Sequence, residues 1–380
     1  MPLAPIVVAT ILAHAAFNGC RLTLSLSALS QGASPLTVGT IMSLFAALPM
    51  LLGVPAGRMV DRVGVRGPIL AAASALVFVV ALPGLFPGIA TLYVTAAAVG
   101  TSFMLFHVCV QHAVGQGSHE RDRRANFGWL ALGFSISNFF GPLTAGLAID
   151  SFGFDRTFLL LSIFAAASTA LLALRRSSFT HTPHGEREDN PHSTLELLRD
   201  PHLLRVFLAT GLLASAWDMF VFVMPIYGTS IGLSASTIGF ILAAFASATF
   251  LVRILLPVIQ RHVREWTMIT ATMAVACVAY GLFPVMHTVA LLAAAAFLLG
   301  LGLGATQPSV MSLLYASAPE GRAAEAVGVR AVVLNASQTF LPLLFGGLGA
   351  ALGMTPVFLT MSVALAGGGV LSNRVRNAVS

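Results

Sequence analysis

The sequence has no lysine and few charges of either sign. All 20 basic residues are arginine, and charged residues make up only 9% of the 380 residues, against roughly 25% in a soluble globular domain. With 57% hydrophobic residues and a mean hydropathy of +0.89, most of the chain can be solvated only by lipid or by itself. The Gly-Lys-Ser/Thr ending of a phosphate-binding loop is impossible here, and no other enzyme signature is present. We therefore expect a protein that is not an enzyme, needs no cofactor and uses an ion gradient rather than ATP.

Cysteine is equally scarce. Cys20, Cys109 and Cys277 all fall within apolar runs, which excludes a secreted disulfide framework and predicts small apolar packing residues. The N-terminus lacks a charged segment followed by a small-residue cleavage site, so we expect the first apolar run to be retained.

The sequence is rich in long apolar runs. Runs of about 20 residues between polar or Gly/Pro breaks predict about twelve membrane spans. In lipid each run can satisfy its own backbone hydrogen bonds only as a helix, because the period-two alternation of a barrel is absent. The expected fold class is all-α integral membrane, with spans at 5–29, 36–57, 68–86, 90–113, 127–149, 157–174, 203–227, 235–258, 267–286, 290–314, 327–349 and 354–373.

The chain also repeats itself at a spacing of two hundred residues. The shift superimposes residues that shape helices: Gly39 on Gly239, Gly100 on Gly300, Gly128 on Gly328, Pro142 on Pro342, Gly146 on Gly346 and Gly153 on Gly353. We expect two pseudo-symmetric six-helix bundles, residues 1–176 and 203–380, joined by a polar linker at 177–202. Parallel halves of this kind are typical of transporters with a site between the halves.

Arginine positions predict the orientation. Of the 20 arginines, 18 fall at the N-terminal ends of odd spans, the C-terminal ends of even spans, or the adjoining loops and tail; Arg21 and Arg156 are the exceptions. These loops should face the cytoplasm, which places both termini inside a cell membrane, with a bacterial inner membrane favoured. Because these arginines are assigned to anionic lipid, no basic face remains for nucleic acid. We expect a monomer whose partners are membrane lipids, protons and a small-molecule substrate.

One motif is specific. Between the second and third spans stand Gly57, Asp61, Arg62, Gly64 and Arg66. This spacing resembles the signature loop of the major facilitator superfamily, and the resemblance implies a gating loop whose carboxylate docks on a helix N-terminus to close the cytoplasmic side. The second-half counterpart at 257–266 lacks the acid at the position of Asp61, where Arg261 stands, so we expect a latch in one half only.

The fifth span carries a second resemblance. Gly128, Gly141, Pro142 and Gly146 are similar to the antiporter motif of the drug:proton exchangers in that family, with Ser137 and Ala145 in place of glycines. The alternative is ordinary small-residue packing, which the repeat of Pro142 and Gly146 in the second half favours. The fourth span lacks the arginine that those exchangers carry before a glycine, which argues against multidrug exchange.

Two charges stand inside predicted spans. Asp218 is the only acid well inside one and Arg21 the only deep base, and each costs at least about 2.5 kcal/mol there unless paired or hydrated. Arg21 lies sixteen residues from the start of its span and Asp218 fifteen, so the two should share a depth. We expect a charge pair across the two halves, serving either proton coupling or, alternatively, as a static salt bridge.

Other polar residues predict a cavity face. His14, Asn18 and Arg21 form one stripe of a helix. Taken singly, each polar residue could equally be an interhelical hydrogen bond. The expected substrate-binding residues are His14, Asn18, Arg21, His107, Gln111, Trp217, Gln307, Asn335 and Gln338.

Three functions compete on these grounds. The leading one is proton-coupled secondary transport of a small organic molecule by alternating access, with Asp218 as proton carrier, Arg21 as its partner, and export slightly favoured. The second is uptake of an organic anion clamped by Arg21. The third is copper transport through Met104, His107, Cys109 and His112, which is weakened because His107 and Cys109 point to different helix faces; no metal site is expected.

Overall fold

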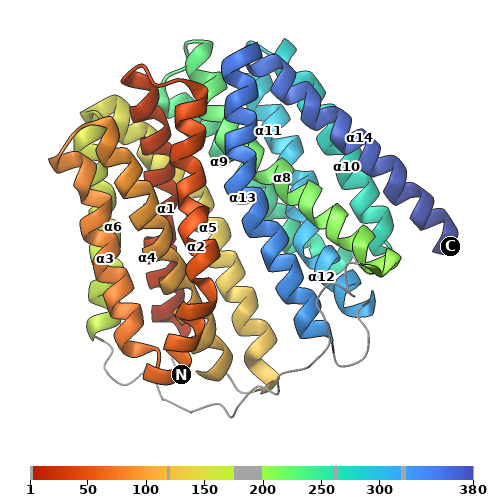
Figure 1. Ribbon diagram of the computed structural model, residues 1–380, viewed down its shortest axis with the longest axis horizontal. Helices are drawn as coiled ribbons and strands as arrows, with labels where there is room; N and C mark the ends of the chain where they lie inside the picture. The colour runs from red at the N-terminus through yellow and green to blue at the C-terminus, as the bar shows by residue number, and fades with distance from the viewer. Residues whose placement is uncertain (1–2, 118–119, 175–198, 260–262, 318–321, 380) are drawn as a thin grey trace.

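The computed structural model describes residues 3–117, 120–174, 199–259, 263–317 and 322–379. Within these ranges the regular structure is helical, without a strand, and 12 helices are long and apolar enough to cross a membrane. The expected all-α membrane fold is therefore confirmed. Figure 1 shows the first half of the chain on the left and the second half on the right.

The first half contains six helices. Their bounds are α1 (Leu3–Ser30), α2 (Pro35–Val63), α3 (Arg66–Leu85), α4 (Ile89–Gly117), α5 (Glu120–Phe152) and α6 (Phe154–Leu174). We call the end where α2 meets α3 the arginine-rich end, since Arg58, Arg62 and Arg66 lie there; it is the lower end in Figure 1. The end where α1 meets α2 is called the opposite end.

The second half follows the same course. Its elements are α8 (Pro201–Ser230), α9 (Ala235–Ile259), α10 (Glu265–Leu282) with a 3₁₀ turn at Phe283–Val285, α11 (Val289–Gly304), α12 (Thr306–Ser317), α13 (Ala323–Leu352) and α14 (Met354–Val379). Most of the predicted linker at 177–202 lies outside the described residues.

The predicted span 290–314 is not one continuous helix. It is interrupted at Ala305, between α11 and α12. Gly304 packs against Thr249 of α9, where an added Cβ would lie 2.8 Å from the Thr249 Cα, and Pro308 has no amide hydrogen for the Gly304 carbonyl. Close approach and a missing hydrogen bond together explain the break.

The repeated glycines and prolines join the two halves. They meet at two equivalent crossings: Gly39 of α2 lies against Pro342 and Gly346 of α13, and Gly239 of α9 lies against Pro142 and Gly146 of α5. At each crossing, backbone atoms of the partner helix occupy the place of a side chain. Both crossings lie toward the opposite end, which the halves close by direct helix packing.

One carboxylate strengthens the second crossing. The backbone N–H of Ala235 donates to Oδ1 of Asp150 over 3.2 Å, and that of Ser236 donates to Oδ2 over 2.8 Å. Asp150, at the end of α5, thereby caps the N-terminus of α9 from the other half of the molecule. The repeat position is Ala350, so only one crossing has this cap.

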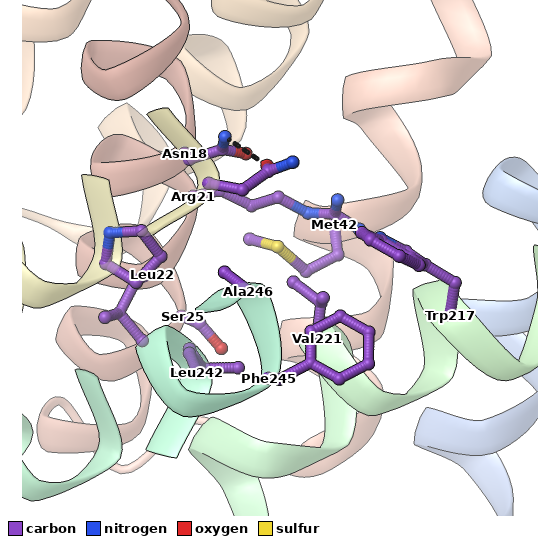
Figure 2. Close-up of a pocket in the computed structure, with 12 residues that line it drawn as sticks. Asn18, Arg21, Leu22, Ser25, Met42, Trp217, Val221, Leu242, Phe245 and Ala246 are labelled. Atoms are coloured by element: carbon purple, nitrogen blue, oxygen red, sulfur yellow. Dashed lines mark hydrogen bonds between the residues drawn. The ribbon is translucent and has the colours of Figure 1, made fainter. Parts of the chain in front are cut away.

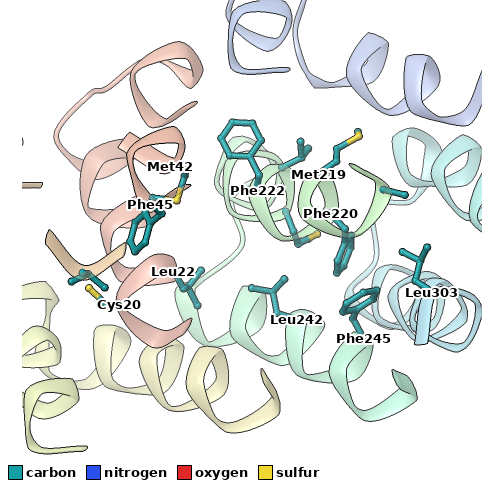
Figure 3. Packing of buried hydrophobic residues seen from close by; sticks show 14 of the residues in the cluster. Cys20, Leu22, Met42, Phe45, Met219, Phe220, Phe222, Leu242, Phe245 and Leu303 are labelled. Atoms are coloured by element: carbon teal, nitrogen blue, oxygen red, sulfur yellow. The ribbon is translucent and has the colours of Figure 1, made fainter. Parts of the chain in front are cut away.

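Apolar side chains line the space between the halves below these crossings. Figure 3 shows Leu22 and Met42 of the first half near Leu242 and Phe245 of the second, and all four are buried. This packing leaves the few polar side chains at mid-depth in an apolar surrounding.

Candidate functional site

A cavity lies between the two halves at mid-depth. It is bordered by α1, α2, α5, α8 and α9 (Figure 2), and the space free of protein atoms there, open solvent included, is about 590 Å³. Its polar border consists of Asn18, Arg21, Ser25, Asn138 and Trp217. Three of the residues that the sequence analysis expected to bind substrate, Asn18, Arg21 and Trp217, therefore border one cavity.

Arg21 and Asp218 act on each other electrostatically across the halves. Asp218 is buried, at 6% exposed, and Arg21 is half-buried. Among the salt bridges of the described residues none joins them, so the pair interacts through space rather than by direct contact. Within the same described part of the chain, the Arg21 side chain forms no hydrogen bond and its Nε is enclosed without a partner. Figure 2 shows it extending toward Trp217.

Asp218 and its repeat equivalent Asn18 each have a side-chain amide as neighbour, at equivalent positions of the two halves. The Nδ2 of Asn18 donates to Oδ1 of Asn138 over 2.8 Å, joining α1 to α5. In the second half, the side chain of Gln338 on α13 lies near the carboxylate of Asp218 on α8 and acts on its charge. Asn138 and Gln338 also occupy equivalent repeat positions. The second half therefore carries a charge where the first half has a neutral amide.

Asn138 was missed by the sequence prediction. The repeat could have identified it, because Asn138 stands two hundred residues before Gln338, an expected binding residue. The aromatic neighbours are equivalent in the same way. Phe17 meets Phe45 edge-on at 5.5 Å between ring centroids, and Trp217 meets Phe245 at 4.7 Å.

A second polar layer lies closer to the arginine-rich end. His14 Nδ1 lies 2.5 Å from Oγ of Ser137, and the rings of His14 and Phe103 stack at 5.1 Å. On α4, His107 Nε2 lies 3.1 Å from Nε2 of the exposed Gln111. None of His14, His107 and Gln111 borders the cavity directly, and His14 contacts Asn18, which does.

Arg253 corrects the predicted distribution of arginines. Its place near the C-terminal end of α9 suggested contact with the lipid surface, but its Nη1 donates to Oγ of Ser135 over 2.6 Å and to the carbonyl of Ala131 over 3.3 Å, both on α5. The physical reason is that this face of α9 turns toward α5 rather than toward lipid. Arg330 of α13 is also drawn inward, and its Nε is enclosed without a partner. Arg21 is therefore not the only interior base.

Two predicted binding residues remain, Gln307 and Asn335, and Asn335 does not border the cavity. The side chain of Gln307 lies outside the described part of the structure. Asn335 is half-buried on α13, where its backbone carbonyl accepts a hydrogen bond from Oγ1 of Thr339 over 2.9 Å.

The predicted gating loop is mostly helical. Gly57, Asp61 and Arg62 belong to α2, which continues to Val63, because their backbone hydrogen bonds extend the helix past the apolar span. Only Gly64 has the positive φ, 81°, that a glycine supplies at a tight turn, and Arg66 begins α3. Asp61 Oδ1 lies 3.5 Å from Nδ1 of His112 on α4, within the same half.

The antiporter-like residues of α5 serve different contacts. Gly128 is exposed and an added Cβ there would meet nothing within 4 Å, whereas Gly141 packs on Ala15 of α1. Pro142 and Gly146 form the crossing with α9. The candidate copper ligands also diverge, since His112 faces Asp61 and His107 faces Phe134; no group of three His, Cys, Asp or Glu that could hold a metal occurs among the described residues.

Comparisons with known proteins agree with this architecture. A family model described as Major Facilitator Superfamily matches residues 6–342 and 206–377. A solved POT family transporter in complex with a thioalcohol-conjugated peptide matches at 15% identity and a TM-score of 0.84, covering 100% of this chain and 96% of that one. A POT family transporter in complex with 5-aminolevulinic acid gives 16% identity, a TM-score of 0.82 and coverage of 97% and 94%.

A third structure, a bacterial homolog of the human lysosomal transporter Spinster in an inward-facing and unoccupied conformation, gives 14% identity, a TM-score of 0.76 and coverage of 98% and 94%. At such identities the likeness concerns the fold. No curated protein matches the sequence.

Proposed function

The chain belongs to the major facilitator superfamily, and on that premise we propose that it couples the movement of a small organic molecule to a proton gradient. Secondary transport of a small molecule follows from the family and from the transporter fold. The coupling ion, the direction and the roles of individual residues are the proposal.

The single observation behind proton coupling is the asymmetry between Asn18 and Asp218. Asn18 hydrogen-bonds to Asn138 on the fifth span of its half, and Asp218 interacts with Gln338, the amide at the equivalent position of the second half. An amide side chain at this position is therefore sufficient for helix packing. A carboxylate in its place contributes nothing further to packing and costs at least about 2.5 kcal/mol in desolvation. A carboxylate retained at such a cost is suited to carrying a proton.

Arg21 gives the carboxylate two environments. A nearby cation stabilises the ionised form of an acid, and burial without one stabilises the protonated form. Arg21 and Asp218 belong to different halves, so a relative movement of the halves changes their separation. Alternating access would then load and release a proton at Asp218.

For direction we propose export, supported by the antiporter-like sequence of α5. The second candidate, uptake of an organic anion, is favoured by one observation: Arg21 forms no hydrogen bond within the described residues and borders the cavity, leaving its donors for a carboxylate. Small organic molecules are also what two of the similar structures hold.

For gating we propose that Asp61 contributes to closure of the arginine-rich end. It contacts His112 here, and the exchange of that partner for a helix N-terminus would accompany closure. Asp61→Asn should increase the reactivity of a cysteine placed at Gln111 toward a reagent added at that end. An unchanged reactivity removes Asp61 from the gate.

The function is tested by a flux panel in proteoliposomes. Cationic, neutral and anionic solutes are each followed with and without an imposed pH gradient. Accumulation of at least one solute class that requires the gradient is expected. Transport that proceeds equally in its absence, at matched membrane potential, contradicts proton coupling.

A further inference from the structure

Arg253 is an interior cation that the transport proposal does not use. It lies on α9, seven residues after Ala246, which borders the central cavity. Seven residues are two helical turns, so the two share one face of α9 and Arg253 lies about 10 Å closer to the arginine-rich end. A solute moving between the cavity and that end passes this layer.

The surroundings of Arg253 contain no described acid that neutralises it. No carboxylate among the described residues lies within 4.0 Å of its guanidinium. The charge of Arg253 interacts electrostatically with His14 of α1, and His14 also interacts with His107 of α4. The hydroxyl of Ser135 on α5 accepts from Arg253, and that of Ser137 contacts His14. The layer thus combines one cation, Arg253, with imidazole and hydroxyl groups that can form hydrogen bonds.

Only part of the guanidinium is occupied. Nη1 donates to Ser135 and to the Ala131 carbonyl, while Nε and Nη2 form no hydrogen bond with any described residue. Neither of these two nitrogens is enclosed by protein, unlike Nε of Arg21 and Nε of Arg330. A guanidinium edge with open donors matches the two oxygens of a carboxylate or a phosphate.

We infer that Arg253 is a second anion-contacting residue on the transport path and that the substrate class is organic oxyanions, carboxylates or phosphates. The inference rests on the proposed transport function and adds the substrate class to it. Arg21 holds the anion at mid-depth, and Arg253 contacts it about two helical turns closer to the arginine-rich end.

A purely structural role is the competing explanation, because Nη1 bridges α9 to α5. The two roles differ in what Ser135 does. If Arg253 serves only as a bridge, Ser135→Ala and Arg253→Gln should have the same effect. If Arg253 contacts the anion, Ser135→Ala leaves the guanidinium in place and frees a further donor.

The test measures binding to the full chain in phosphatidylcholine nanodiscs, which contain no anionic lipid, by titration calorimetry without a gradient. The probes are succinate and inorganic phosphate, with glycerol as the neutral comparison. We expect one oxyanion to bind and Arg253→Gln to weaken its affinity at least tenfold.

The other variants separate the two roles. Arg253→Lys should lose less affinity than Arg253→Gln, and Ser135→Ala should bind the oxyanion as tightly as the unmodified protein or more tightly. Arg374→Gln, which removes an exposed arginine, is the matched control and should bind normally.

Two results overturn the inference: neither oxyanion binds the unmodified protein, or Ser135→Ala weakens binding as much as Arg253→Gln. Both are independent of proton coupling, which is measured separately by gradient-driven flux. Loss of coupling with intact oxyanion binding would instead reject the proposed function while leaving the anion site in place.

Discussion

At the scale of single residues, the central feature is a charge where the repeat has an amide. Asn18 and Asp218 show that this position tolerates a neutral side chain bonded to an amide on the neighbouring helix. Arg21 has no counterpart of this kind, since its repeat equivalent Val221 is apolar and borders the same cavity. Each half thus contributes one charge that the other half lacks.

Removing one charge of this pair should cost more than removing both. Arg21→Ala leaves a buried carboxylate without its nearby cation, whereas the double variant Arg21→Ala with Asp218→Asn leaves no charge to compensate. We expect the double variant to unfold at a higher temperature than Arg21→Ala. The corresponding difference in the free energy of unfolding should be on the order of 1–3 kcal/mol. Thermal unfolding in detergent, followed by tryptophan fluorescence, measures this. Equal melting temperatures would show that the two charges are not coupled.

The sequence identified the central pair because charges in apolar runs are rare. Arg21 and Asp218 stood out for that reason, and equal depth followed from helical rise. Arg253 was assigned to the lipid surface because distance from a helix end does not reveal which face of the helix turns inward. Asn138 was missed because a single amide within a membrane span does not by itself indicate a binding residue. Only its equivalence to Gln338 distinguishes it.

At the scale of helices, two pseudo-symmetric crossings hold the opposite end closed. α2 meets α13 and α5 meets α9 through glycines that admit the partner backbone. The repeat in the sequence predicted that these glycines and prolines shape the backbone. It did not predict that they meet one another across the halves, because a repeat shows equivalence and not contact.

The second crossing should be sensitive to one added methyl group. Gly239→Ala places a Cβ 2.5 Å from the carbonyl oxygen of Pro142, which overpacks the crossing by about 1–3 kcal/mol. We expect faster labelling of a cysteine at Ser25 by an impermeant thiol reagent added at the opposite end. Gly128→Ala is the matched control, since its Cβ meets nothing within 4 Å. Equal labelling rates in the two variants would mean that the crossing does not hold this end closed.

The cap on α9 should have a similar but electrostatic effect. Asp150→Ala removes the acceptor for two backbone N–H groups, a loss of about 0.5–2 kcal/mol for a helix cap. We expect a larger population of long distances between spin labels at Gln31 and Thr229, measured by pulsed electron resonance. Asp155→Ala, an exposed acid at the same end, is the control. If both variants give the same distance distribution, the cap does not stabilise the closed end.

Helix interruptions were the least predictable elements. The sequence predicted one span at 290–314 with no break inside it, because the apolar residues on both sides of Ala305 are together long enough to cross a membrane. The break depends on how closely α11 approaches α9 at Gly304, which is a tertiary property. By contrast, the turn at Gly64 was expected, and the structure gives it the positive φ that favours glycine.

At the scale of the whole molecule, a duplicated architecture carries asymmetric chemistry. The halves share their helix order and their crossings, while Asp150, Arg253, Arg21 and Asp218 each occur in one half only. The shared helix order and crossings determine how the two halves pack. The four residues that occur in one half only make the interface between the halves charged and asymmetric.

Orientation in the membrane is a property of the whole chain. Because short loops rich in arginine stay in the cytoplasm, cysteine labelling in intact cells should find Asp61 and Arg374 positions protected from an impermeant reagent. Positions Ser34 and Thr229, at the opposite end, should be labelled. The reverse pattern would invert the proposed topology and the side on which the arginine-rich end lies.

The most direct test of the account is proton-driven flux by Asp218→Asn in liposomes, using a solute that the unmodified protein accumulates. The variant should fold, because it recreates in the second half the amide pair that Asn18 and Asn138 form in the first. We expect accumulation driven by the pH gradient to be lost, while exchange of solute across the membrane without a gradient survives in part. Full gradient-driven accumulation by Asp218→Asn would contradict the account and reduce the Arg21 and Asp218 pair to a structural contact.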